Sequence, residues 1–120
     1  EELARPDPII DDMALFLRGQ GGVSVIFGCA HAGGINTLDH IYQFMGRQPL
    51  DTLVGGLHLL AASPERISRT IAAVRANPPA RMGFCHCTGL PAIHRLWTEF
   101  PDACMEIHTG RQLHFAEALK

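Results

Sequence analysis

Three histidines follow short apolar segments that are typical of β-strands: His31, His58 and His86. Glycines lie within three residues of each of them. In an open α/β sheet, ligands bind at the carboxyl ends of the strands, so parallel strands would bring these histidines to one edge. Imidazole is the commonest metal ligand near neutral pH, and thiolates add soft ligands for zinc. The repeated placement therefore predicts a metal site at that edge.

A structural role is the alternative for each histidine taken alone, because a histidine at a strand end is usually a hydrogen-bonded structural residue. This alternative is strongest for His58, which lies between Leu57 and Leu59 and could be a core residue or could support a ligand. The remaining histidines fall inside predicted helices or near the C-terminus, and we expect them to be exposed or structural: His40, His94, His108 and His114.

The four cysteines are Cys29, Cys85, Cys87 and Cys104. The N-terminus has neither the basic region nor the apolar region of a signal peptide, so we expect reduced thiols and a cytoplasmic location. Cys85 and Cys87 flank His86, and alternation along an extended chain would point both of them away from it, toward the core. A thiol-based sensor at these two residues is a further hypothesis, and Cys104 is most simply a small apolar residue.

Thr88 and Gly89 follow His86 directly, at a predicted helix start. Thr88 is expected to cap that helix, with Pro91 close to its first turn. The free N–H groups of a helix N-terminus bind phosphate or carboxylate well. Thr88 and Gly89 are thus candidates for binding an anionic substrate group, and an ordinary cap is the alternative.

Alternating strand and helix patterns connect these sites. Apolar runs predict strands at 13–18, 23–27, 52–59 and 81–84, and helical spacing predicts helices that begin near Ile35, Pro64 and Leu90. Two closing strands, 104–108 and 112–115, are expected around a turn at 109–111. The order β-β-α-β-α-β-α-β-β indicates an α/β fold with a mixed sheet that is parallel in its centre and with about three helices.

Composition narrows the class of protein. The chain has 120 residues, a formal net charge of −2 and 47% hydrophobic residues. This charge argues against a nucleic-acid partner, and the hydrophobic content predicts that residues 1–120 fold as a single domain. Since no apolar run approaches the ~18 residues of a membrane span, we also expect no membrane partner.

Four segments together resemble the metallo-β-lactamase superfamily. They are Gly-Cys-Ala-His-Ala-Gly at 28–33, Val-Gly-Gly-Leu-His-Leu at 54–59, Cys-His-Cys-Thr-Gly at 85–89 and Asp-Asp-Met-Ala-Leu at 11–15. The sequence is similar in particular to the branch of metal-dependent hydrolases that includes archaeal dihydropterin ribofuranosyl-aminobenzene phosphate synthases. The resemblance runs from about residue 9 to residue 115.

The resemblance implies the C-terminal half of an αββα sandwich, in which one or two metal ions lie between two similar halves. The zinc motif His-x-His-x-Asp-His of the N-terminal half does not occur in this sequence. By the match, His86 corresponds to a late metal-binding histidine, and His31 is the ligand expected after the preceding strand. Cys29 stands where many members place a bridging aspartate, and His58 belongs to a motif of the branch.

The function implied is metal-dependent hydrolysis of a small molecule that bears phosphate or carboxylate, with zinc or another divalent ion such as manganese as cofactor. The chain alone is expected to be inactive, because it lacks the carboxylates of the other half. A partner is expected, either that N-terminal half or a second copy in a homodimer, since a lone half would expose one face of its sheet. The alternative is a non-catalytic α/β domain that keeps the fold and serves association.

Overall fold

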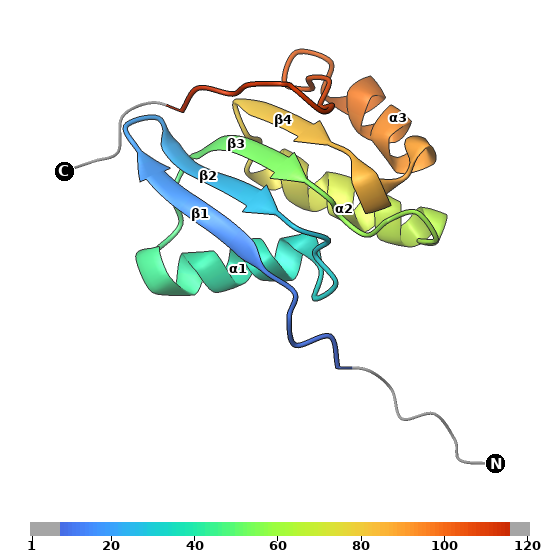
Figure 1. Cartoon of the computed structure of the whole chain (residues 1–120), viewed down its shortest axis with the longest axis horizontal. Helices are drawn as coiled ribbons and strands as arrows, with labels where there is room; N and C mark the ends of the chain where they lie inside the picture. The colour runs from blue at the N-terminus through green and yellow to red at the C-terminus, as the bar shows by residue number, and fades with distance from the viewer. Residues whose placement is uncertain (1–7, 116–120) are drawn as a thin grey trace.

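The computed structural model describes residues 8–115 and contains one mixed sheet with the strand order β1-β2-β3-β4. Its strands are β1 (Ala14–Gly19), β2 (Gly22–Phe27), β3 (Leu50–Gly55) and β4 (Arg81–Phe84). β1 and β2 form an antiparallel hairpin, whereas β2, β3 and β4 are parallel (Figure 1). The predicted α/β class, with a parallel centre, is confirmed.

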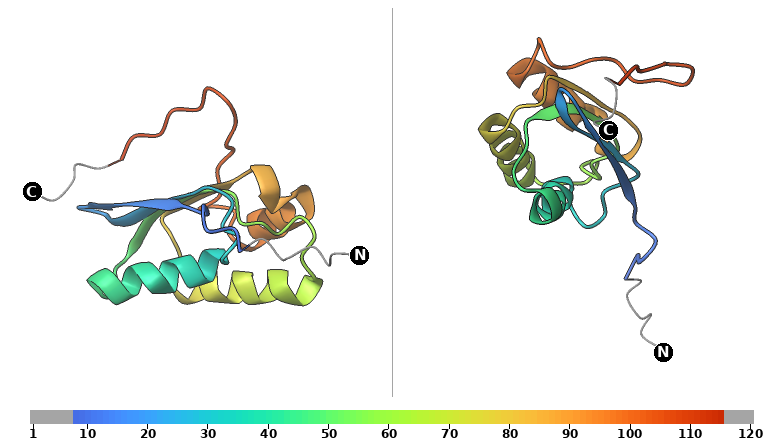
Figure 2. Two further views of the ribbon diagram at one scale, coloured as in Figure 1. Left: turned by 60° about the horizontal axis from the view of Figure 1, so that its bottom comes forward. Right: turned by 90° about the vertical axis from the view of Figure 1, so that its left-hand side faces the viewer.

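Two helices connect the parallel strands, α1 (Gly34–Met45) and α2 (Pro64–Ala76), and α3 (Leu90–Glu99) follows β4 after a 3₁₀ turn at His86–Thr88. Figure 2 shows α1 and α2 side by side beneath one face of the sheet. The start of α2 is the one predicted, because the Ser63 hydroxyl accepts a hydrogen bond from the Arg66 N–H and Pro64 opens the first turn.

The core lies between this sheet face and the helices. Alternate residues of β2 point into it, and Val23 and Val25 are fully buried. They pack in one cluster with residues from the neighbouring elements, among them Leu38 of α1, Ile71 of α2, Met82 of β4 and Leu96 of α3. The apolar residues that alternate along the strands therefore pack against the apolar faces of the helices, which repeat about every 3.6 residues.

The opposite face of the sheet carries apolar side chains without a helix above them. Leu15 and Leu17 on β1 are 56% and 39% exposed, and Ile26, beside Leu15 in the ladder, is half-buried. The segment after α3 passes over part of this face, where Ile107 approaches Gly83 so closely that a Cβ at Gly83 would lie 2.2 Å from Ile107 Cγ1. Within the described residues, no segment covers the β1 side of this face.

The two predicted closing strands are wrong. After α3 the chain makes a single parallel bridge between Met82 and Cys104, and among the described residues 104–115 form no further ladder. The turn between them is present, with the Arg111 N–H donating to the His108 carbonyl. The physical reason is that the chain leaves the edge of β4 after this bridge and crosses over Gly83, so its backbone cannot pair with a neighbouring strand.

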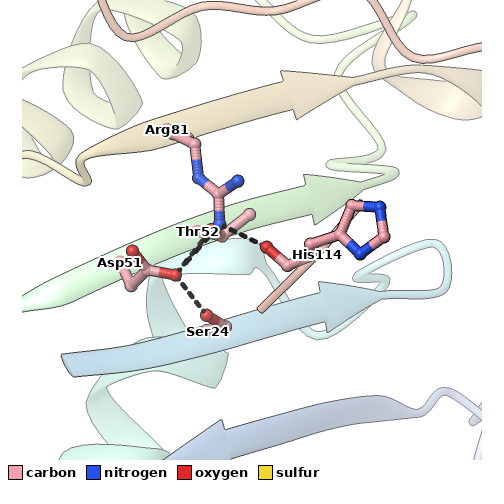
Figure 3. A network of polar contacts seen from close by, with 5 residues as sticks. All are labelled: Ser24, Asp51, Thr52, Arg81 and His114. Atoms are coloured by element: carbon pink, nitrogen blue, oxygen red, sulfur yellow. Dashed lines mark hydrogen bonds and ion pairs between the residues drawn. The ribbon is translucent and has the colours of Figure 1, made fainter. Parts of the chain in front are cut away.

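A polar network joins three strands and the crossing segment (Figure 3). Asp51 accepts hydrogen bonds from the hydroxyls of Ser24 and Thr52 and forms an ion pair with Arg81 at 3.3 Å. Arg81 also donates to the His114 carbonyl. Desolvation opposes ionisation, but the hydrogen bonds from Thr52, Ser24 and Arg81 outweigh it and hold the pKa of Asp51 below its usual value.

We predict that Asp51→Asn lowers the free energy of unfolding near neutral pH, and that the difference from wild type shrinks on acidification. A carboxyl whose pKa is lower in the folded state stabilises the fold above its unfolded pKa of about 3.9. This contribution is lost as the pH falls through the lowered folded value. Urea unfolding of both proteins between about pH 3 and pH 7 measures it.

The control is Asp39→Asn, which neutralises an exposed carboxylate on α1 and should change stability by less than about 0.5 kcal/mol. A constant difference between Asp51→Asn and wild type over the whole pH range would contradict the electrostatic account of the network.

Candidate metal centre

The loops after β2, β3 and β4 begin at the same level of the sheet. Phe27 pairs with Gly55 and Gly55 pairs with Phe84, so the three parallel strands end side by side. Each loop then contains a non-glycine residue with left-handed backbone, namely Ala30 (φ 53°), His58 (φ 49°) and His86 (φ 53°). Such residues cost about 1–3 kcal/mol each and persist where the surroundings fix them, often at functional sites.

The tightest group of metal-ligating side chains at this edge joins two of these loops. The ligand atoms of Cys29, His86 and Cys87 all lie within 4.8 Å of one another. Cys29 Sγ is 3.1 Å from His86 Nε2, and the Cys87 thiol donates to the Cys29 carbonyl at 3.5 Å. Desolvation, together with the neighbouring Cys87 thiol, raises the pKa of Cys29. The arrangement offers two sulfur donors and one imidazole nitrogen.

The expectation that Cys87 points away from His86 toward the core is wrong. Alternation requires an extended chain, but His86–Thr88 form a 3₁₀ turn in which the Thr88 N–H donates to the Cys85 carbonyl. His86 enters this turn with a positive φ, which brings the Cys87 thiol back toward Cys29. Strand or helix periodicity in the sequence cannot predict such a turn. The Cys-His-Cys spacing was the sequence feature that could have indicated a shared site.

His31 and His58 form a second group. Their rings meet edge to face with centroids 4.5 Å apart. Among residues 8–115, His31 Nδ1 is buried and has no hydrogen-bond partner, and a carboxylate oxygen of Asp12 lies 3.9 Å away. A buried ring nitrogen without a partner is free to bind an ion, so the residues present fit a metal. His58 itself is exposed rather than part of the core.

The three predicted histidines are thus divided between two groups. Within residues 8–115, the trio of His31, His58 and His86 does not form one set of adjacent donor atoms. His31 contacts His58, whereas His86 contacts Cys29. Metal binding by each of them remains a prediction.

The expectation that Thr88 caps the helix is wrong. Gly89 is the N-cap of α3, and Thr88 is fully buried with its hydroxyl accepting a hydrogen bond from the Leu57 N–H at 2.9 Å. The hydroxyl therefore connects the 3₁₀ turn to the loop after β3. Substrate binding by Thr88 and Gly89 remains a prediction, and Gly89 lines a cavity.

That cavity, about 480 Å³ in volume, adjoins the cysteine–histidine group. Its lining includes His86, Leu60, Leu90 and Trp97 as well as Gly89. Trp97 is 42% exposed, because α3 turns the neighbouring Leu96 into the core instead. The strand-end histidine and an open apolar cleft therefore lie together.

Two known proteins are similar to this chain, one in structure and one in sequence. The crystal structure of Tm1679, a metal-dependent hydrolase of the β-lactamase superfamily, superposes on 87% of this chain with a TM-score of 0.80 and 31% sequence identity. The chain has the fold of part of such a hydrolase. The 7,8-dihydropterin-6-methyl-4-(β-D-ribofuranosyl)-aminobenzene-5′-phosphate synthase of Methanocaldococcus jannaschii is 28% identical over 109 residues, which are 91% of this chain. No protein-family profile matches the chain.

The matches confirm the resemblance and the fold class. The chain spans 40% of the length of the β-lactamase-superfamily hydrolase and 37% of the archaeal synthase, so it corresponds to only part of either protein. The hydrolase in the comparison depends on a metal, and the donor groups described above are chemically suited to a divalent ion. In the described part of the chain, no helix is long and apolar enough to cross a membrane.

We predict that Thr88→Val destabilises the fold by about 1–3 kcal/mol, because it leaves the buried Leu57 N–H without an acceptor while nearly preserving volume. Thr88→Ser keeps the oxygen and loses only a methyl group, so it should cost clearly less. Chemical unfolding of the three proteins measures both effects. Equal stabilities of Thr88→Val and wild type would show that the hydroxyl does not hold the 3₁₀ turn.

Proposed function

We propose that this chain is the C-terminal half of a metal-dependent hydrolase that acts on a small molecule bearing phosphate or carboxylate. The observation that carries the proposal is the position of His31, His58 and His86 on loops that leave one edge of a sheet whose fold is shared with a metal-dependent hydrolase. Carboxyl ends of parallel strands are where such folds bind ligands.

The residues proposed to hold the cofactor are His31, His58 and His86, and zinc or another divalent ion such as manganese is the proposed ion. A bound divalent ion would supply Lewis-acid polarisation of the scissile group. The unpartnered Nδ1 of His31 supports this role. Asp12, whose other carboxylate oxygen accepts the Ala32 N–H at 3.0 Å, holds the loop that carries His31.

The substrate is proposed to lie in the cleft beside His86. Gly89, at the N-terminus of α3, lines this cleft, and the N–H groups of a helix start favour an anionic group. Leu60, Leu90 and Trp97 would contact the apolar part of the same molecule. The four free cysteines support a reducing, cytoplasmic location.

The other half of the sandwich is the partner proposed for the open sheet face, and a second copy in a homodimer is the alternative occupant. Leu15 and Leu17 supply apolar surface there. Without the carboxylates expected from the other half, the histidine set of the isolated chain should hold metal weakly, and the chain should turn over little substrate. The competing function, a non-catalytic association domain, is favoured by the same exposed face and differs in needing no metal.

We predict that His31→Ala abolishes most zinc binding, because it removes a ligand, whereas His58→Ala should cost less, about tenfold in affinity, if His58 only supports a ligand. Competition with a chromophoric chelator measures both affinities. His40→Ala, an exposed histidine on α1, is the control and should leave the affinity unchanged.

The same preparations can be screened on phosphoesters, lactones and β-lactams with added zinc or manganese. We expect little turnover. Unchanged affinity in His31→Ala would overturn its assignment as a ligand. Robust turnover that disappears in His86→Ala would instead show that the chain is a self-sufficient enzyme rather than a half.

We also predict self-association of the isolated chain at micromolar concentration, because burying the open sheet face removes apolar area from water. Leu15→Glu should shift the chain toward monomer, whereas Phe44→Glu, at a 72% exposed position on α1, should not. Sedimentation velocity measures the oligomeric state of wild type and of both variants. A compact monomer that binds no hydrophobic dye would mean that this face needs no partner.

A further inference from the structure

We propose that Cys29, Cys87 and His86 form a thiolate-rich metal site that takes one zinc ion, and that this chain binds the ion without its other half. The inference goes beyond the proposed function, since neither sulfur belongs to the histidine set and binding requires no hydrolytic activity. The two proposals share only His86.

The donor positions fit a single ion. Zinc with bonds of about 2.3 Å to sulfur and about 2.0 Å to nitrogen, in tetrahedral geometry, needs these donors about 3.5 Å apart. Cys29 Sγ and His86 Nε2 are 3.1 Å apart, and Cys87 Sγ lies within 4.8 Å of both. Shifts of about one ångström in side-chain position, within reach of rotamer adjustment, would complete the set.

Backbone hydrogen bonds hold together the loops that carry Cys29, His86 and Cys87 before any ion binds. The Cys85 N–H donates to the Gly55 carbonyl, and the Gly56 N–H donates to the Gly28 carbonyl, so both loops are tied to the one between them. A Cβ at Gly56 would lie 2.6 Å from Cys87 Sγ, which shows how closely the thiol is packed. Since the backbone of these loops is already held, mainly side-chain rotamers lose freedom on binding, which keeps the cost in conformational entropy low.

The donor chemistry selects the ion. Soft thiolates favour zinc over magnesium or manganese, which prefer oxygen ligands. Three protein ligands leave one position open, as in catalytic rather than structural zinc sites. His86 is exposed and lines the cleft described above, so the open position would be reachable from solvent.

The test is a cobalt titration of the whole chain, kept reduced with a phosphine under nitrogen. Thiolate ligation gives sulfur-to-cobalt charge-transfer absorption in the near ultraviolet, and zinc should displace the cobalt. Cys29→Ser and Cys87→Ser should each lose most of this absorption and at least ~10-fold in zinc affinity. Cys85→Ser and Cys104→Ser are matched controls that should keep the absorption and the zinc affinity. Circular dichroism checks that the four variants fold.

A second measurement needs no variant. Alkylation of the wild-type chain, mapped by mass spectrometry, should show that zinc protects Cys29 and Cys87 and leaves Cys85 reactive. Burial raises the pKa of Cys104 to about 11, so Cys85 is the better reference thiol. This arm decides the question if Cys29→Ser or Cys87→Ser does not fold.

Two results would overturn the proposal: cobalt binding without charge-transfer absorption, or equal alkylation of Cys29 with and without zinc. The histidine site fails separately. If His31→Ala retains full zinc affinity and charge-transfer absorption, the thiolate site stands and the assignment of His31 as a ligand falls. If His31→Ala loses zinc affinity while Cys29→Ser and Cys87→Ser do not, the outcome is the reverse.

Discussion

The close approach at Gly56 is the constraint on which the candidate metal centre depends. A Cβ at this residue would lie 2.6 Å from Cys87 Sγ and 2.7 Å from the Gly28 carbonyl oxygen, and both distances are shorter than side chains tolerate. Gly56 lies on the loop after the central parallel strand, between the loops that carry Cys29 and His86. Any larger residue at this position would force these loops apart. The donor atoms of Cys29, His86 and Cys87 would then also separate.

The strained residues beside Gly56 are stable because other contacts fix them. His86 has left-handed backbone, and the turn that follows it is held by the Thr88 hydroxyl, which is buried against the Leu57 N–H. The opposite end of the sheet contributes through Asp51 and Arg81, which tie the starts of β3 and β4 to each other. The histidines and cysteines therefore lie on short segments that leave strands held together by such contacts.

Much of this arrangement could be predicted because it follows local rules. The hairpin and the three helices each depend on a few neighbouring residues, and the strand-end histidines follow from topology. The partnership of Cys87 with Cys29 could not be found that way, since it requires a 3₁₀ turn that begins with a histidine at positive φ. The apolar residues of segment 104–115 predict strands that do not form, because Ile107 packs on Gly83 across the sheet face and the segment makes no ladder.

The two candidate donor sets would create different electrostatic sites around the same cleft. A divalent ion held by two thiolates and one imidazole is close to neutral, because each thiolate cancels one of its charges. An ion held by neutral histidines alone keeps both positive charges and attracts phosphate or carboxylate more strongly. His86 is the residue common to both sets, and its Nε2 lies 3.1 Å from Cys29 Sγ in this structure. Whether His86 shares an ion with sulfur or with nitrogen therefore determines how strongly the cleft beside Trp97 and Gly89 favours an anion.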